Sequence, residues 1–323
     1  DCTGKEIMRV LRDEVVNRKI PILEYAPAIE LILDDEGKAA GAVLFDYDSN
    51  EYQVVRAKTV IMATGGAGRL HYQGFPPSNH YGATADGLIL AYRAGAPLIY
   101  AEACQYHPTG VAFPAQIYGA LVTEKVRSVG AQIINSEGEA FMHPLQTRDV
   151  AAASIIREST ARGKGVKALD GVAVWLDTPI IDMIHGEGTI EKRIPGMMRM
   201  YAKFGIDIRK EPILIYPTLH YQNGGILIND KAETKIPGFF VAGEAVGGIH
   251  GTNRLMGNSL LDIIVFGRIA GKEAAAKAKA TTLGKLNIDH VAKYAQEKAA
   301  AGVVNDTPSP KLLPVYTHGR NAR

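Results

Sequence analysis

Residues 59–68 read TVIMATGGAG, a short apolar run that passes directly into a cluster of glycines. A buried strand that ends in glycines lets backbone N–H groups come close to a nucleotide, as at the strand ends of open α/β sheets. A second apolar run at residues 236–242 meets Gly243, Gly247 and Gly248 in the same way. Together the two segments predict an α/β fold with a nucleotide-binding sheet edge.

The stretches around these segments predict further helices and a small sheet. Residues 4–19 place apolar side chains close to a helical period, with Thr3 as the N-cap and Glu6 completing a capping box. Short β-rich runs separated by turn residues follow, and they predict an antiparallel sheet. The predicted strands are residues 21–25, 29–33, 40–47 and 51–56, and further helices are expected at 82–95 and 258–279.

The composition is that of an ordinary globular protein. The chain has 323 residues and a formal net charge of +2, which favours two domains and gives no reason to expect nucleic acid as a partner. Cys2 and Cys104 form no CxxC pair, which predicts no metal site, no iron–sulfur cluster in this chain and a reducing compartment. No apolar run reaches the roughly 20 residues of a membrane span, so no direct span and a cytoplasmic location are expected.

Five polar segments combine His, Arg or Thr with turn residues. Taken singly, each has a structural explanation, because a lone His beside a Gly is commonly a packed residue and an Arg next to an Asp is commonly a surface ion pair. Their order along the chain is what gives them meaning. The segments are QYHPTG at 105–110, TEKVR at 123–127, TRD at 147–149, LHY at 219–221 and HGTNR at 250–254.

In the order of these segments and in the residues of each, the chain resembles the flavoprotein subunits of fumarate reductase and succinate dehydrogenase. The resemblance covers about residues 1–280 and implies FAD as cofactor and fumarate or succinate as substrate. The probability that eight motifs match in the same order by chance is very small. They are ATGGAGR (63–69), TADG (84–87), QYHPTG (105–110), TEKVR (123–127), RDVAAA (148–153), HYQNGG (220–225), VAGEA (241–245) and HGTNRLMGNSLLD (250–262).

The resemblance implies a binding role for four of these residues. Fumarate and succinate are dianions, and each carboxylate needs charged or well-aimed donors in a dry pocket. Arg254 and His220 would hold one carboxylate, and His107 and Thr123 would hold the other. A carboxylate twisted out of the alkene plane leaves an alkene carbon electrophilic, so that flavin N5 can deliver hydride to it.

The resemblance also implies that Arg148 gives a proton to the neighbouring carbon. Arginine normally stays protonated, so Arg148 would need placement against the developing carbanion and rapid reprotonation. Glu124 and Arg127 match the proton relay of the family, with Asp149 as a candidate orienting partner. A structural ion network of Glu124, Arg127 and Asp149 is the alternative interpretation.

Cofactor contacts are expected around the glycine segments and at the start of the long helix. Glu244 follows the second strand, where its carboxylate can accept hydrogen bonds from ribityl hydroxyls. The N–H groups and positive dipole end of the helix that begins near residue 258 suit the electron-rich O2 edge of the flavin, and a plain N-cap is the other interpretation of Ser259. The full set is Thr64, Gly65, Asp86, Glu244, Asn258, Ser259 and Leu260.

The chain departs from the family pattern in three respects, one of which is a much reduced helical region after residue 280. No GxGxxG motif is present, so the expected architecture is a split FAD-binding domain that lacks its N-terminal βαβ unit and holds an inserted α+β capping domain. Lys125 replaces a small residue and adds charge near the relay. The expected boundaries are residues 1–112 and 216–282 for the FAD-binding domain, 113–215 for the capping domain and 283–323 for a reduced C-terminal extension.

Other functions fit the same residues. L-aspartate oxidase shares the arginines, the histidines and the Thr-Glu pair, and aspartate is also a C4 dicarboxylate. An inactive, flavin-free fragment is the non-enzymatic alternative, while a ketosteroid dehydrogenase is disfavoured by so many carboxylate-binding cations. The resemblance further implies an iron–sulfur electron-transfer subunit or another electron donor as partner, with membrane association through partner subunits.

Overall fold

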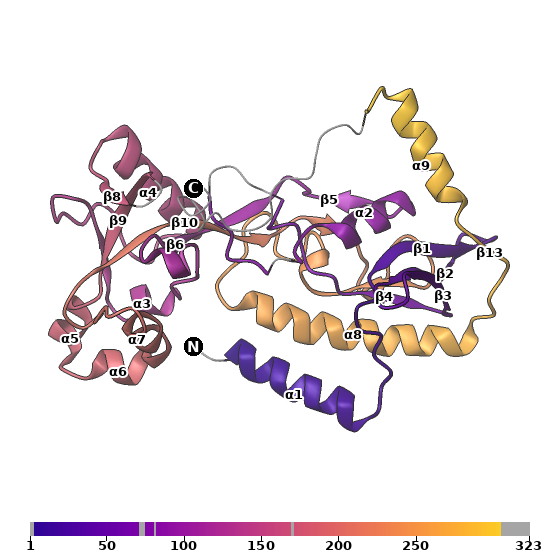
Figure 1. The fold of residues 1–323 in the computed structure, drawn as a ribbon, viewed down its shortest axis with the longest axis horizontal. Coiled ribbons are helices and arrows are strands. Elements are labelled where there is room, and N and C mark those ends of the chain that lie inside the picture. The colour runs from indigo at the N-terminus through magenta and orange to yellow at the C-terminus, as the bar shows by residue number, and fades with distance from the viewer. Residues whose placement is uncertain (1–2, 71–74, 81, 169–170, 305–323) are drawn as a thin grey trace.

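A computed structural model describes residues 3–70, 75–80, 82–168 and 171–304. The chain forms two lobes joined by two long antiparallel strands, β6 (Cys104–Val111) and β10 (Ile213–Gln222) (Figure 1). The segment between these strands builds one lobe, here called the insert lobe. The segments before β6 and after β10 build the other, here called the base lobe. Residues on β6 and β10 therefore lie where the two lobes meet.

A four-stranded antiparallel sheet at the edge of the base lobe has the order β13-β1-β2-β3. Three of its strands and the turns between them confirm the sequence predictions. The fourth, contributed from late in the chain, pairs Leu33 with Asn287, and no local pattern indicated it. The strands are β1 (Ala28–Asp34), β2 (Ala39–Asp46), β3 (Glu51–Arg56) and β13 (Leu286–Asn287).

The two apolar runs that precede the glycine clusters lie side by side as a parallel pair. β4 (Val60–Met62) pairs in register with β12 (Phe239–Val241), and all of β12 is buried. Carboxyl ends of parallel strands meet at one edge, so both glycine clusters gather there. This pairing confirms the sheet edge that the sequence predicted.

One predicted strand does not form, and another forms but is less buried than expected. Residues 21–25 form no strand, because Tyr25 adopts a φ of 55°, a left-handed conformation that interrupts extended backbone. β4 was expected to be buried, but its central residue Ile61 is 45% exposed. The reason is that the sheet of β4 and β12 has two strands in the part of the chain described, and the Ile61 side of β4 is left uncovered.

The predicted helices form near their expected bounds. Thr3 is the first residue of its helix rather than the cap, and Glu6 pairs with Arg9 instead of closing a capping box. The second helix begins later than residue 82, because Ala85 has a left-handed φ of 64°. The helices of the base lobe are α1 (Thr3–Asn17), α2 (Asp86–Arg93), α8 (Asn258–Ala280) and the unpredicted α9 (Asp289–Ala300).

The insert lobe surrounds a five-stranded sheet of order β6-β10-β9-β7, with β8 paired to β9. Val122, Ile155 and Leu176 are among its fully buried core residues. The helices and strands of the insert lobe agree with the expected α+β class, while the exact domain boundaries stay predictions. The elements are α3 (Lys125–Ser128), β7 (Gln132–Ile134), α4 (Arg148–Ile156), β8 (Val166–Ala168), β9 (Gly171–Asp177), α5 (Ile180–His185), α6 (Thr189–Arg193) and α7 (Pro195–Ala202).

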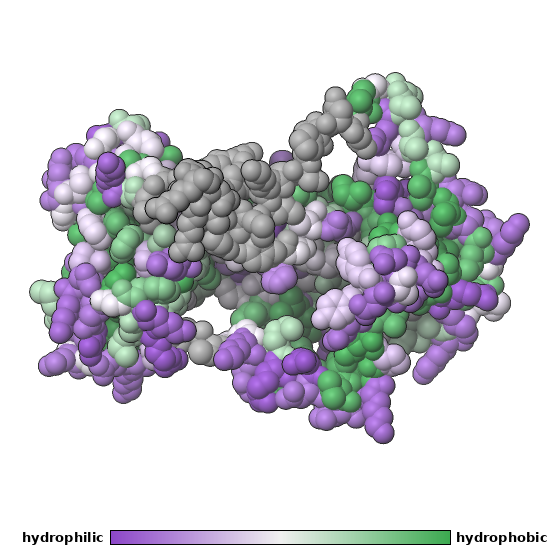
Figure 2. Space-filling model, in the orientation of Figure 1, coloured by the Kyte–Doolittle hydropathy of each residue, from purple (hydrophilic) through white to green (hydrophobic). Residues whose placement is uncertain are grey.

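Apolar side chains reach the surface of the base lobe (Figure 2), including Leu261 and Val265 on α8. Even so, no described helix combines the length and apolarity that crossing a bilayer requires. The later part of the predicted C-terminal extension, residues 305–323, lies outside the described residues. The remaining short elements are β5 (Leu98–Ile99), β11 (Gly225–Ile226) and the single turns η1 (Ala115–Ile117), η2 (Arg157–Ala161) and η3 (Gly243–Ala245).

A Gly224→Ala substitution should destabilise the fold. A Cβ at Gly224 would lie 1.7 Å from the backbone oxygen of Tyr100, and overpacking against rigid backbone costs roughly 1–3 kcal/mol or more. Gly271→Ala is the control: nothing lies within 4 Å of its Cβ position on α8, so the helix should gain roughly 0.5–1 kcal/mol. Urea unfolding measures the free energy of unfolding of each variant. Equal values for both variants and the parent would contradict the close packing at Gly224.

Candidate active site

Arg148 lies buried at the start of α4, between a carboxylate and an amide. Its side chain is 8% exposed, its Nε donates to Glu124 Oε2 at 3.1 Å, and its Nη1 donates to Gln105 Oε1 at 2.8 Å. Burial lowers the pKa of the Arg148 guanidinium, and the Glu124 carboxylate opposes that shift. Arg148 is therefore a charged donor held in dry surroundings.

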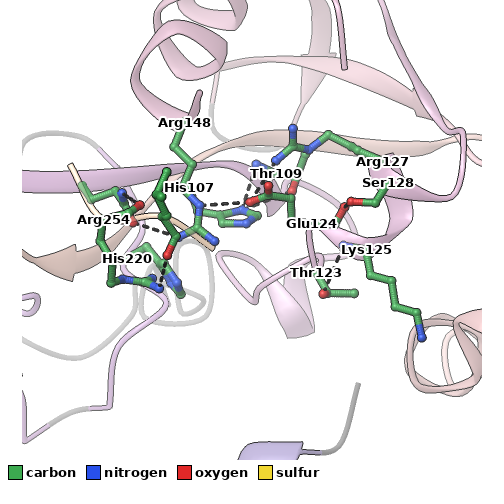
Figure 3. A network of polar contacts seen from close by, with 12 residues as sticks. His107, Thr109, Thr123, Glu124, Lys125, Arg127, Ser128, Arg148, His220 and Arg254 are labelled. Carbon is green, nitrogen blue, oxygen red and sulfur yellow. Dashed lines mark hydrogen bonds and ion pairs between the residues drawn. The ribbon is translucent and has the colours of Figure 1, made fainter. Parts of the chain in front are cut away.

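Glu124, which is partly buried, and the buried Arg127 extend this contact into a chain of charged groups (Figure 3). The same Glu124 Oε2 lies 3.5 Å from Arg127 Nη2, and Arg127 also donates to the carbonyl of Pro144. Burial lowers the pKa of Arg127. The fold thus brings together Glu124, Arg127 and Arg148, as a proton relay requires, whereas Asp149, expected in the alternative ion network, accepts a hydrogen bond from Asn253.

His107 sits on β6 with one ring nitrogen satisfied and the other not. The N–H of Thr109 donates to its Nδ1 at 3.2 Å, so the neutral ring carries its proton on Nε2. Burial, and then the charges of neighbouring basic groups, hold the pKa of His107 well below its usual range. Nε2 is buried and meets no hydrogen-bond partner in the described residues. A donor left in this state costs free energy until an acceptor arrives.

His220 faces His107 from the neighbouring strand β10, with 5.2 Å between the ring centroids. Its Nδ1 lies 2.8 Å from Ser78 Oγ, and that hydroxyl donates to the carbonyl of Leu219 at 3.1 Å. The same hydroxyl proton can be given to His220 Nδ1 instead, the nearer acceptor, and the neutral ring then carries its proton on Nε2. Burial and the charge of Arg148 lower the pKa of His220 to about 3, so both histidines are neutral near neutral pH.

Arg254 comes from the loop before α8 and stacks on an aromatic ring. Its guanidinium carbon lies 4.3 Å from the centroid of the Tyr221 ring, a cation–π contact. The residue is 4% exposed, and its buried Nε has no partner among the described residues. Burial and the charge of Arg148 lower the pKa of Arg254 to about 10. Arg254 is therefore a cation with unused donors.

The two arginines and two histidines converge on one region (Figure 3). Arg148 lowers the pKa of His107, His220 and Arg254, which places all four within one electrostatic neighbourhood. Glu124 pairs with Arg148, whereas Arg254 forms no ion pair within the described part of the chain. Buried cations are costly unless compensated, so the arrangement favours a small anionic ligand.

Thr123 and Lys125 lie at the outer end of this cluster. Thr123 Oγ1 accepts the backbone N–H of Lys125 at 3.4 Å. Within the described residues it makes no hydrogen bond to His107, the residue expected to bind the same carboxylate. The Lys125 side chain extends away from Glu124 and Arg148 (Figure 3). The geometry therefore gives Lys125 no contact with the relay that its charge was expected to affect.

The cofactor residues predicted after β4 and β12 lie at one edge. Gly65 has a φ of 77°, and the space at its Cβ position is open within 4 Å. Gly66 packs closely, since a Cβ there would lie 2.8 Å from Glu244 Oε1. That oxygen accepts the N–H of Gln222 at 2.9 Å, and burial raises the pKa of the Glu244 carboxyl. An open backbone cradle beside a buried carboxyl fits a cofactor rich in hydroxyl groups.

Asp86 is brought to the same edge by α2. Its carboxylate accepts the hydroxyl of Thr84. A Cβ at Gly87 would lie 2.0 Å from Thr64 Oγ1, so the first turn of α2 packs directly against the loop that follows β4. Asp86 and Thr64 therefore belong to one surface, as a shared cofactor site requires.

The start of α8 differs in detail from the prediction. Gly257 precedes it with a φ of 82°, and no side chain caps the helix. Ser259 lies within the first turn and is not the N-cap. The N–H groups of Asn258 and Leu260 donate to loop carbonyls at 3.3 and 3.1 Å, so these two donors, expected to face the cofactor, are already engaged. The positive dipole end of the helix is unaffected by these contacts.

Three polar residues that sequence reasoning left unassigned take part in the site. Gln105 contacts Arg148, and Asn253 contacts Gln105. Asp262 is 4% exposed, accepts the Tyr221 hydroxyl at 3.3 Å and lies 3.3 Å from a ring nitrogen of His250. Gln105 lies in the motif QYHPTG, and Asn253 and Asp262 lie in HGTNRLMGNSLLD. Their place within these motifs could have indicated a role in the site.

Replacing His220 by Asn should flatten the pH dependence of folding. The folded-state pKa of about 3 lies below the value of about 6.5 in an unfolded chain. The unfolded chain therefore binds the extra proton, and stability falls as the pH drops through this window. One such histidine contributes a slope of about 1.4 kcal/mol per pH unit.

Urea unfolding at several pH values between about 4 and 6.5 would measure that slope. The exposed His143→Asn variant is the matched control and should keep the parental slope. Parallel lines for the parent and His220→Asn would contradict the prediction.

Known proteins are similar to this chain in sequence and in architecture. A family model described as FAD binding domain matches residues 2–260. One component of the CoM/CoB fumarate reductase of Methanothermobacter marburgensis is 38% identical over 288 residues, 87% of this chain and 50% of that protein. L-aspartate oxidase of Nostoc sp. is 38% identical over 281 residues, 83% of this chain and 46% of that protein. A solved structure of E. coli quinol fumarate reductase has a TM-score of 0.72 and 31% identity, covering 88% of this chain and 50% of that one.

The chain spans about half the length of these relatives. The matched residues 2–260 include both strand–glycine segments and every predicted site residue. The chain therefore belongs to the family of FAD-dependent oxidoreductases formed by the flavoprotein subunits of fumarate reductase and succinate dehydrogenase.

Proposed function

We propose that the protein to which this chain belongs interconverts fumarate and succinate with FAD as cofactor. One observation carries the proposal: Arg254 and His107 are buried, and each keeps a donor without a partner in the described residues. Arg148 adds positive potential to both. A small dianion would supply the acceptors and the negative charge that this cluster lacks.

Each substrate carboxylate is held by two residues. Arg254 and His220 hold one carboxylate: the planar guanidinium offers two parallel donors, and Nε2–H of His220 donates when the Ser78 hydroxyl bonds to Nδ1. The Nε2–H of His107 and the hydroxyl of Thr123 hold the other. The Thr123 oxygen accepts from Lys125, so its own proton remains available to donate. Holding a carboxylate out of the alkene plane weakens conjugation and leaves one alkene carbon electrophilic.

Arg148 gives the proton that reduction needs and takes it back in oxidation. FAD, when bound, supplies or accepts an electron pair as hydride. An ordinary guanidinium is too weak an acid for this task, but burial lowers the pKa of Arg148 and eases the loss of its proton. Glu124 contacts both Arg148 and Arg127 and passes the replacement proton along this relay.

The cofactor would be held along the edge where β4 and β12 end. Two observations support the fit: the open space at Gly65 and the buried carboxyl of Glu244 beside the same loop. The dipole end of α8 suits an electron-rich ring edge. The proposed cofactor residues are Thr64, Gly65, Asp86, Glu244, Asn258, Ser259 and Leu260.

Oxidation of L-aspartate is the second candidate function. An L-aspartate oxidase is among the relatives, and aspartate presents two carboxylates at the spacing of succinate. The same four carboxylate-binding residues would serve it, so only the reaction itself separates the two candidates.

Electrons would be exchanged with an iron–sulfur subunit or another donor. This proposal follows from relatives that are named as subunits of fumarate reductase and succinate dehydrogenase complexes. Attachment to a membrane through such subunits, and otherwise a cytoplasmic location, remain predictions.

Two assays on the purified protein mixed with FAD test the proposal. Fumarate-dependent oxidation of a reduced viologen is the expected result. L-aspartate-dependent peroxide formation would instead favour the second candidate. Bound FAD with neither activity would overturn the dicarboxylate proposal. If this chain alone folds without binding FAD, the activity belongs to a longer protein that contains it.

Arg148→Ala should lower turnover by at least about 10²-fold while FAD stays bound, because a positioned proton donor contributes on this scale. The control is Lys125→Ala, which removes a nearby positive charge that extends away from the cluster and should leave turnover essentially unchanged. Steady-state kinetics and the flavin spectrum measure both effects. Retained turnover in Arg148→Ala would mean that Arg148 is not the proton donor.

Arg254→Ala should weaken dicarboxylate binding by roughly 2–5 kcal/mol, the range for losing one partner of a buried charged pair. The loss should be seen in KM and in the dissociation constant of a non-reacting dicarboxylate, with the flavin spectrum retained. Unchanged affinity would mean that the carboxylate binds elsewhere.

A further inference from the structure

Four polar side chains form a closed ring between the two lobes. Arg148 Nη1 donates to Gln105 Oε1 at 2.8 Å, and Gln105 Nε2 donates to Asn253 Oδ1 at 2.8 Å. Asn253 Nδ2 donates to Asp149 Oδ1 at 2.9 Å. Because Asp149 directly follows Arg148, the ring begins and ends on the first turn of α4.

The chemistry of the groups sets the direction of every bond in this ring. A guanidinium only donates, so Gln105 must present its oxygen to Arg148. A backbone carbonyl only accepts, so Gln105 must present its nitrogen to the carbonyl of Arg254, at 2.6 Å. The second N–H of that nitrogen meets Asn253 Oδ1, which turns the Asn253 nitrogen toward the Asp149 carboxylate. One orientation of each amide satisfies all of these contacts.

Gln105 is the member of the ring that contacts both arginines of the site. It is 3% exposed on β6, Arg148 belongs to the insert lobe, and Arg254 belongs to the base lobe. A neutral amide suits this place, because a carboxylate there would neutralise positive charge that a dianionic ligand needs. Asp149 carries the negative charge of the ring, and it lies exposed at the outer end against Asn253.

We propose that Gln105 is a positioning residue that holds Arg148 and Arg254 at a working separation, and that the Asn253–Asp149 bond secures α4 against the loop before α8. The inference rests on the proposed function of the same site. Loss of the ring would let α4 shift relative to Arg254, and a misplacement of about 1 Å can cost about 10²-fold in rate. A purely structural role would lower stability and leave kcat and KM of the folded enzyme unchanged.

Gln105→Met is the first test, made in the FAD-loaded protein. Methionine fills similar space but cannot replace the three hydrogen bonds. We expect kcat to fall by about 10²-fold and KM to rise, because both arginines lose an anchor. The flavin spectrum should be retained. Gln53→Met is the matched control, since it removes an amide that binds Asp46 on the distant antiparallel sheet, and its kinetics should match the parent.

An exchange of side chains at positions 149 and 253 is the second test. Asn253→Asp alone sets two carboxylates against each other and should lower kcat by about tenfold. Combined with Asp149→Asn, the carboxylate accepts from Gln105 and the amide donates back to it across the same gap. Most of the lost kcat should then return, a recovery that double-mutant analysis reads as direct coupling.

Unchanged kcat and KM in Gln105→Met, or a double variant no faster than Asn253→Asp, would overturn the positioning role. Turnover of fumarate by the parent protein would still support the proposed function in that case. A parent protein that binds FAD and acts on neither fumarate nor aspartate would overturn both.

Discussion

The burial of three guanidinium groups is the constraint on which the rest of the site depends. Arg127, Arg148 and Arg254 are 1%, 7% and 4% exposed, and an uncompensated buried charge costs several kcal/mol. Glu124 is placed between the first two, and the ring of Tyr221 supports the third. The compensation is incomplete, so positive potential remains where the lobes meet. Burial is the main cause of the lowered pKa values of the neighbouring histidines, and this positive potential adds to it. The same potential makes the region receptive to a dianion.

The pairing of β6 with β10 places His107 and His220 next to each other in this region. Thr218 lies opposite His107 in the ladder, and the register shifts between Leu219 and Tyr221. His220 falls within that shift, and a local irregularity of this kind can re-aim a side chain next to an active site. As a result the two histidines face each other across neighbouring strands. The hydrogen bond from the Thr109 N–H then assigns the tautomer of His107, and the Ser78 hydroxyl contacts Nδ1 of His220.

The sequence predicted the elements whose pattern is local. The two strand–glycine segments, three strands of the antiparallel sheet and α8 all have apolar periodicity or turn residues that act over a few positions. The strand expected at residues 21–25 failed because one left-handed residue, Tyr25, outweighed a β-rich composition. β13 was missed because its two residues become a strand only by pairing with β1. The exposure of Ile61 likewise depends on what covers β4.

For the site, the sequence by itself determined which residue types are present and in what order, and motif order was enough to name Arg148, Glu124, Arg127, His107, His220 and Arg254. Only the tertiary structure decided which atoms meet. Gln105 and Asn253 are 148 positions apart along the chain, and a residue pattern carries no information about a hydrogen bond across that distance. Tautomers, pKa shifts and the direction in which Lys125 points depend on burial and on neighbours from other elements, which exist only once the two lobes have folded around β6 and β10.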